Sequence, residues 1–142
     1  MKRMFIFLAL MLCLQMAKAQ YPAFKTYDNI SLGTLSVKLY GNLAGNPPCN
    51  RLNFTSNIGV PTSPSLLVMA SSAPWSSPGA SSVINGFQYL ENIGGMLVAG
   101  PVVSMCAIAP GTYSYSIPGG STFNMIVEIE TAPSCLKVRI VP

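Results

Sequence analysis

The side chains best placed for chemistry are two acidic and two basic residues in the stretch VEIETAPSCLKVRIV. Glu128 and Glu130 are two residues apart, and Lys137 and Arg139 repeat that spacing after a short turn. Paired carboxylates can act as general acid and general base, as they do in glycosidases. A general acid needs a raised pKa, however, whereas basic neighbours lower the pKa of a carboxyl group. We therefore expect these four residues to form ion pairs on the solvent-facing side of a sheet.

The sequence lacks the residue types that most catalytic and metal sites require. It contains no histidine, which excludes Ser-His-Asp and Cys-His catalysis and histidine metal centres. It also lacks a phosphate-binding loop, a dinucleotide-binding glycine fingerprint and an acidic calcium loop. An enzyme would have to gather Asp28, Glu91 and Glu128 in one pocket. We expect a protein that is not an enzyme and that uses neither a metal nor a cofactor.

The cysteines point to a disulfide instead. Cys13 lies in a segment that we expect to be removed, which leaves Cys49, Cys106 and Cys135. In an oxidising compartment these would give one disulfide and one odd thiol. If the last four strands run up and down in order, Cys106 and Cys135 lie at the same end of the domain, so we predict this pair, with Cys49 and Cys135 as the alternative. We expect the third thiol to be buried as a small hydrophobic group; the other interpretation is an intermolecular link.

Three aromatic residues are candidates for a binding surface. Trp75, the only tryptophan, lies in the proline-bearing loop SSAPWSSPG. A ring in such a loop can face solvent, and together with Tyr113 and Tyr115 it would form a platform for a glycan or a partner protein. The other interpretation is a tryptophan folded back over the open end of the domain.

The N-terminal segment has the three-part pattern of a secretory signal peptide, which we place at residues 1–19. Lys2 and Arg3 precede an apolar run over residues 4–14, and small residues precede Gln20. The apolar run is too short to span a bilayer. We expect a mature chain that begins at Gln20, has no membrane span, and is secreted to the extracellular space, the periplasm or the cell surface.

Removal of this segment takes away the apparent basicity. The net charge is +4, and three of the positive charges precede Gln20. The charges that remain almost cancel: Lys25, Lys38, Arg51, Lys137 and Arg139 against Asp28, Glu91, Glu128 and Glu130. No basic stripe is left to neutralise phosphates, so we expect no nucleic-acid partner.

The elements that position these residues are predicted to be strands. Turn-forming residues interrupt short apolar stretches roughly every ten residues, which is typical of all-β sandwiches and barrels. No window has a helical period. The sequence predicts one domain over residues 20–142, an antiparallel β-sandwich, immunoglobulin-like or similar, of about seven or eight short strands.

The two segments that flank the turn TAPS allow a register to be predicted. Both alternate between apolar and polar residues, which is the period of a strand with one buried face. If TAPS closes a hairpin, Ile129 lies opposite Leu136 and Glu128 opposite Lys137. A slip by one residue would turn the core outward, so this register is strongly specified.

Other segments are predicted strands of less definite register. One, MLVAGPVVSMCAIA, is almost continuously apolar, which predicts a central strand with a bulge or bend at Gly100 and Pro101. In GTYSYS, tyrosines alternate with serines. The remaining candidates are LSVKLY, RLNFTSNI, SLLVMA and SVINGFQYL.

One stretch, GTLSVKLYGNLAGNPPC, loosely resembles the first strand and first cysteine of secreted fimbrial subunits, small immunoglobulin-like domains that polymerise by strand donation. The likeness covers a small part of the chain and does not extend to the terminal strand, so it identifies no family.

Taken together, these patterns predict a secreted, non-catalytic structural or adhesive protein of the cell envelope or extracellular space that acts through its β-sheet surface. A sheet edge would pair with a protein partner or with a second copy of the chain. The alternative is a soluble carbohydrate- or protein-binding module that uses Trp75, Tyr113 and Tyr115.

Overall fold

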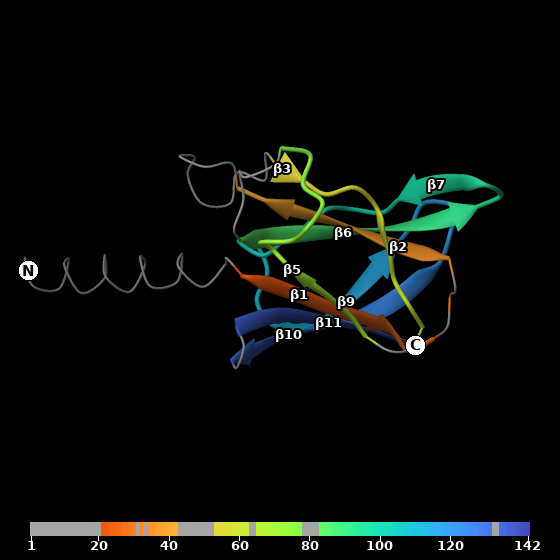
Figure 1. Ribbon diagram of the computed structural model, residues 1–142. Helices are drawn as coiled ribbons and strands as arrows, with labels where there is room; N and C mark the ends of the chain where they lie inside the picture. Colours follow the sequence, from red (N-terminus) through yellow and green to blue (C-terminus); the bar gives the residue numbers. More distant parts are fainter. Residues whose placement is uncertain are drawn as a thin grey trace, which may run out of the picture.

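The structure, a computed structural model, describes residues 21–30, 32, 34–42, 53–62, 65–77, 83–131 and 134–142. Within these ranges every regular element is a strand and none is a helix, which confirms the all-β prediction (Figure 1). The strands are β1 (Ala23–Asp28), β2 (Leu35–Gly41), β3 (Asn53–Phe54), β4 (Ile58–Gly59), β5 (Leu66–Met69), β6 (Ile84–Ile93), β7 (Met96–Ala99), β8 (Val103–Ser104), β9 (Gly111–Ser116), β10 (Thr122–Thr131) and β11 (Ser134–Val141).

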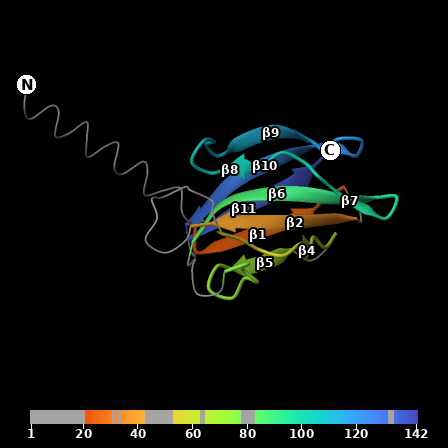
Figure 2. The ribbon, with the colours of Figure 1, turned by 90° about the horizontal axis from the view of Figure 1, so that it is seen from above.

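The strands form two sheets (Figures 1 and 2). The five-stranded sheet has the order β5-β1-β11-β10-β9. The six-stranded sheet has the order β3-β2-β6-β7, with β4 also paired to β2 and β8 to β6. The predicted signal peptide lies outside the described residues.

One strand pair differs from the antiparallel prediction, because β1 runs parallel to β11. The remaining named strand pairs are antiparallel. A parallel pair needs a crossover between its strands, and here nearly the whole domain provides it. The strand pattern of β1 was also missed, because two of the three side chains that it turns inward, Thr26 and Asp28, are polar.

The apolar stretch over residues 96–109 is not the predicted central strand. Its first part, β7, is an edge strand, and its second part is the two-residue strand β8. Both pair with β6, whose ten residues make it the central strand of this sheet. The bend predicted at Gly100 and Pro101 separates β7 from β8. It also brings the Gly100 backbone so close to the Tyr115 ring that a side chain would not fit.

The β10–β11 hairpin has the predicted register. Ile129 pairs with Leu136, and Glu128 pairs with Lys137. The register is continuous over the eight residue pairs from Asn124–Val141 to Thr131–Ser134.

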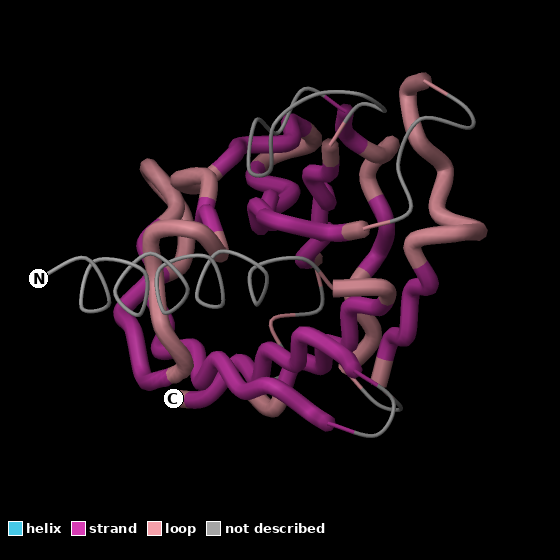
Figure 3. The backbone as a smooth tube through the Cα atoms, turned by 90° about the vertical axis from the view of Figure 1, so that its left-hand side faces the viewer, coloured by secondary structure: helices cyan, strands magenta, loops and turns pink. Residues whose placement is uncertain are grey.

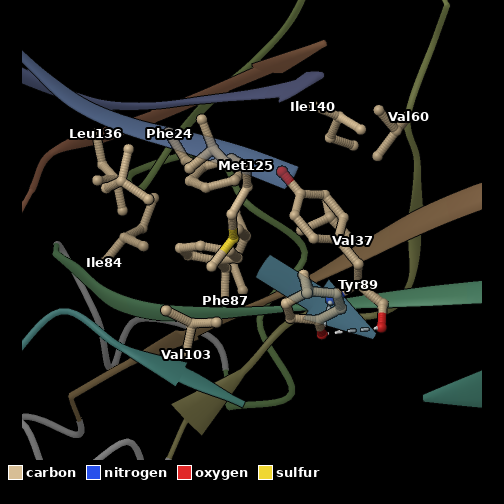
Figure 4. Packing of buried hydrophobic residues seen from close by; sticks show 14 of the residues in the cluster. Phe24, Val37, Val60, Ile84, Phe87, Tyr89, Val103, Met125, Leu136 and Ile140 are labelled. Carbon is tan, nitrogen blue, oxygen red and sulfur yellow. Dashed lines mark hydrogen bonds between the residues drawn. The ribbon is translucent and has the colours of Figure 1, made fainter. Parts of the chain in front are cut away.

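Both sheets contribute side chains to one hydrophobic core, which Figure 4 shows from close by. Phe24 of β1 meets Phe87 of β6 across the two sheets, with ring centroids 5.5 Å apart. Tyr89 of β6 likewise meets Phe123 of β10 at 5.9 Å. In the end-on view the strands of the two sheets surround this common interior (Figure 3). The aromatic contacts therefore hold one sheet against the other.

Two polar contacts join the sheets as well. The hydroxyl groups of Thr26 and Tyr89 are hydrogen-bonded at 2.6 Å in the buried interior. At the turn between β9 and β10, the carboxylate of Glu91 accepts hydrogen bonds from the backbone N–H and the hydroxyl of Ser121, each at 2.7 Å. Glu91 comes from the last part of β6, so this carboxylate ties the turn of one sheet to the central strand of the other.

Candidate interaction surfaces

Five charged side chains form a strip across β1, β11 and β10, on the side of the five-stranded sheet that faces away from the core. Lys137 lies 3.3 Å from Glu128 and 3.2 Å from Glu130. The strip continues from Glu128 to Arg139 at 2.8 Å and from Glu130 to Lys25 at 3.7 Å. The two signs thus alternate along the strip, and the ion pairs expected from the sequence are present.

The ion pairs keep both signs of charge in their ionised forms. Hydrogen bonding to the Arg139 guanidinium, with help from Lys137, lowers the pKa of the Glu128 carboxyl. Hydrogen bonding to Glu130 and then to Glu128 raises the pKa of Lys137, and Glu128 raises the pKa of Arg139. A carboxyl whose pKa is lowered is a poor general acid near neutral pH. The charged strip is therefore suited to structure and not to proton transfer.

The carboxylates that an enzyme would have to gather have separate partners. Asp28 accepts hydrogen bonds from the backbone N–H groups of Ile30 and Leu32, at 2.9 and 2.6 Å. Glu91 binds the β9–β10 turn, and Glu128 belongs to the charged strip. Among the described residues, no group of three or more cysteine or acidic side chains could hold a metal ion.

Trp75 folds back onto the domain. Its indole N–H donates to the carbonyl oxygen of Ala70 at 2.7 Å, and its backbone forms a bridge with Thr55. The half-buried ring packs against the core. Of the two placements considered from the sequence, the structure has the tryptophan turned inward.

The two tyrosines of the predicted platform lie far from Trp75 in the sheet order, because β9 and the strand before the Trp75 loop, β5, are opposite edges of the five-stranded sheet. Tyr115 is only 2% exposed, so its ring belongs to the core and offers no surface to a ligand. Its hydroxyl accepts from the N–H of Tyr89 at 2.9 Å and donates to the carbonyl of Pro101 at 2.7 Å. Burial raises its pKa to about 12. Tyr113 is half-buried and donates to the carbonyl of Ala109 at 2.6 Å.

The predicted disulfide between Cys106 and Cys135 is not formed, since Cys135 is a free, buried thiol. The prediction placed the last four strands in one up-and-down sheet. Instead, Cys106 follows β8 in the six-stranded sheet, whereas Cys135 lies on β11 in the other. The alternative pair, Cys49 with Cys135, is also wrong, because it needs the same free Cys135 thiol. Cys49 itself lies outside the described residues. Cys106 is disulfide-bonded and therefore has no titratable thiol. Burial raises the pKa of Cys135.

A polar and aromatic cluster that the sequence did not reveal lies on the outer side of the six-stranded sheet. The ammonium group of Lys38 lies 4.2 Å from the centre of the Phe54 ring. Tyr40 donates to the side-chain oxygen of Gln88 at 2.7 Å. Alternation along β2 does place Lys38 and Tyr40 on the same face, but the pairing that brings Phe54 beside them depends on the topology. Because Lys38 covers a face of the Phe54 ring, that face is not open to a ligand.

Large apolar side chains are exposed on two edge strands. On β5, Leu67 is 55% exposed and Met69 41%. On β7, Met96 is 71% exposed and Leu97 50%. The hairpin of β6 and β7 extends beyond the neighbouring strands (Figures 1 and 2). Edge strands of this kind have free backbone groups next to apolar side chains, the two features with which another chain can pair.

The remaining edge of the five-stranded sheet is β9. It pairs with β10 in a regular register over six residues, from Gly111 to Ser116. Thr112, Ser114 and Ser116 are exposed on its outer side. The strand contains no charged residue and no proline.

No protein-family model matches this sequence, and neither a search of curated proteins nor one of solved structures found a match. The described part of the chain also holds no helix with the length and apolarity that a membrane crossing needs.

Proposed function

We propose that this protein is a secreted, non-catalytic structural or adhesive component of the cell envelope or extracellular space, and that it acts through the edges of its sheets. The exposed apolar side chains on the edge strands β5 and β7 carry this proposal. Four of the large exposed hydrophobic side chains lie on these two strands: Leu67, Met69, Met96 and Leu97. Exposed apolar edges are a liability that proteins normally protect, so an edge left open is a surface for pairing.

The fold that presents these edges is, in our proposal, a β-sandwich. Two sheets that share one hydrophobic core support it. Such a domain is held by its interior packing, so its edges can pair with another chain while the core stays intact.

Export is the second part of the proposal. The pattern of residues 1–19 supports a signal peptide, and an oxidising destination allows a disulfide. Because Cys135 is a free thiol and Cys106 is bonded, we propose that Cys106 pairs with Cys49.

The alternative function, a glycan- or protein-binding module built on Trp75, Tyr113 and Tyr115, finds no support in the geometry. Tyr115 is buried, and Trp75 lies in the loop after β5, which is the sheet edge opposite β9, where it bridges to Thr55.

The experiment that tests the proposal is a concentration series of the mature chain, residues 20–142, followed by light scattering and sedimentation velocity. We expect assembly to grow with concentration, and the double variant Leu67→Lys/Leu97→Lys to reduce it strongly, because a charge on an edge strand opposes pairing. Ser36→Lys, on the interior strand β2, is the control and should assemble like the unaltered chain. A chain that stays monomeric throughout, or a double variant that assembles undiminished, would refute the proposal.

A further inference from the structure

The other edge of the five-stranded sheet, β9, has hydroxyl side chains where β5 and β7 expose apolar ones. Natural edge strands usually have a lysine, a proline or a bulge that blocks pairing. β9 has none of these over Gly111–Ser116, and its register with β10 is unbroken. Its sequence, GTYSYS, consists of hydroxyl-bearing residues after the glycine. What it presents to another chain is a regular, uncharged template.

This template is close to self-complementary. The run from Thr112 to Ser116 reads Thr-Tyr-Ser-Tyr-Ser, so it is nearly the same in both directions about Ser114. The hydroxyl residues Thr112, Ser114 and Ser116 are exposed on the outer side, whereas the tyrosines alternate with them and face the core side. A strand whose residue types are symmetric about its centre can pair with a copy of itself without a mismatch.

We propose that β9 pairs antiparallel with β9 of a second copy of this chain, across a two-fold axis that passes through Ser114. In this register Ser114 lies opposite Ser114 of the second copy, and Tyr113 lies opposite Tyr115 of the second copy. Thr112 lies opposite Ser116 of the second copy. The two five-stranded sheets become one continuous sheet, and the contact is closed, because the same surface is used on both sides.

The chemistry of each paired position fits this register. Hydroxyl side chains face each other on the outer side, an arrangement in which cross-strand Ser and Thr residues form hydrogen bonds. On the inner side, the half-buried Tyr113 lies opposite Tyr115 of the second copy, whose ring remains buried in its own core. No charge lies on either strand of the seam. Paired residues in this register differ by an even number, so their backbone groups point the same way and a ladder of hydrogen bonds can form.

The inference deepens the proposed function, since it presupposes that the protein associates through sheet edges. It names the occupant of one edge as a second copy. It also differs from that proposal in the strand used, because β5 and β7 take no part in the two-fold contact. The two proposals can therefore fail separately.

Single cysteine substitutions test the two-fold axis directly. Ser114→Cys places two thiols opposite each other at the axis, where paired Cα atoms lie about 4.5–5.5 Å apart, a separation that a disulfide spans. We expect a reduction-sensitive dimer on non-reducing electrophoresis after mild oxidation. Thr112→Cys is the matched control, because it has a serine opposite it and should stay monomeric on the gel. The combination Thr112→Cys/Ser116→Cys should restore the cross-link, and the unaltered chain provides the blank.

A charge at the axis tests the contact without a cross-link. Ser114→Lys sets two like charges opposite each other and should raise the dimer dissociation constant at least about tenfold in sedimentation equilibrium. Ser36→Lys should leave it unchanged. Cross-linking of Ser114→Cys no greater than that of Thr112→Cys, or a Ser114→Lys dimer of unaltered affinity, would overturn the inference while leaving assembly through β5 and β7 in place. A chain without any association would overturn both proposals.

Discussion

The Tyr115 hydroxyl satisfies backbone groups that the strand ladders leave without partners. It accepts the N–H of Tyr89 from the six-stranded sheet and donates to the carbonyl of Pro101 at the bend between β7 and β8. The tyrosine itself comes from β9 in the other sheet. A single buried phenol thereby fixes the distance between the sheets, and it leaves the core only at the cost of both hydrogen bonds.

Removal of this hydroxyl should destabilise the fold. In Tyr115→Phe the buried N–H of Tyr89 and the carbonyl of Pro101 lose their partner, which costs about 1–3 kcal/mol. Tyr113→Phe makes the same chemical change two residues away at an exposed hydrogen bond, and it should change the free energy of unfolding by less than about 0.5 kcal/mol. Urea unfolding of both variants measures the difference. Equal effects of the two substitutions would show that the Tyr115 hydroxyl does not join the sheets.

At the scale of elements, the charged strip fixes how β1, β11 and β10 lie against one another on the outer side. The apolar cross-strand pairs on the core side set the register, and the ion pairs stabilise the same register from the solvent side. Since the pKa of Glu128 is lowered on folding, the unfolded chain binds the proton more readily. The stabilisation of the fold by the ionised Glu128 carboxylate is therefore complete above the ordinary pKa of 4.5. It is lost as the pH falls through the lower, folded-state pKa.

Glu128→Gln should accordingly lower the free energy of unfolding at neutral pH by less than about 1 kcal/mol, because the pair is exposed to solvent. The difference from the unaltered chain should shrink as the pH falls below 4.5 and should also shrink in high salt, which screens exposed charges. Urea midpoints over a range of pH, at low and high salt, give both trends. A difference that stays constant from neutral to acid pH would contradict the assigned role of the carboxylate.

The elements also show which parts of the fold were open to sequence analysis. The β10–β11 register was predictable because both strands alternate and the turn joins them directly. β1 was not, because Thr26 and Asp28 face inward and its partner β11 is more than a hundred residues away in the chain. The prediction of a central strand failed at β7, since its run of apolar residues is exposed at an edge.

The candidate surfaces were predictable only where local pattern decided them. The ion pairs of the charged strip follow from two-residue spacings within one hairpin. Alternation did place Tyr113 and Tyr115 on one side of β9, but it could not tell which side the second sheet covers. The disulfide was mispredicted for the same reason. The position of Cys106 depends on β8 joining the six-stranded sheet, which local pattern does not show.

At the scale of the whole molecule, the number of free thiols distinguishes the oxidised, exported protein from a reduced one. We expect the secreted chain to have a mass that begins at Gln20 and to take up one alkyl group without reduction, only after unfolding, because the thiol is buried and its pKa is raised. After reduction it should take up three groups, and peptide mapping should find Cys49 linked to Cys106. Three reactive thiols without reduction, or a link to Cys135, would contradict the proposed pairing.

The central place of β11 in the five-stranded sheet has a consequence for the order of folding. Its neighbours are β1 on one side and β10 on the other, so β1 and β5 stay unconnected to β9 and β10 until residues 134–141 leave the ribosome. The sheet can thus close only after synthesis of the domain, and non-local pairing of this kind is slow. A nascent chain with this topology therefore exposes the unpaired sides of β1 and β10 until its last strand has been made.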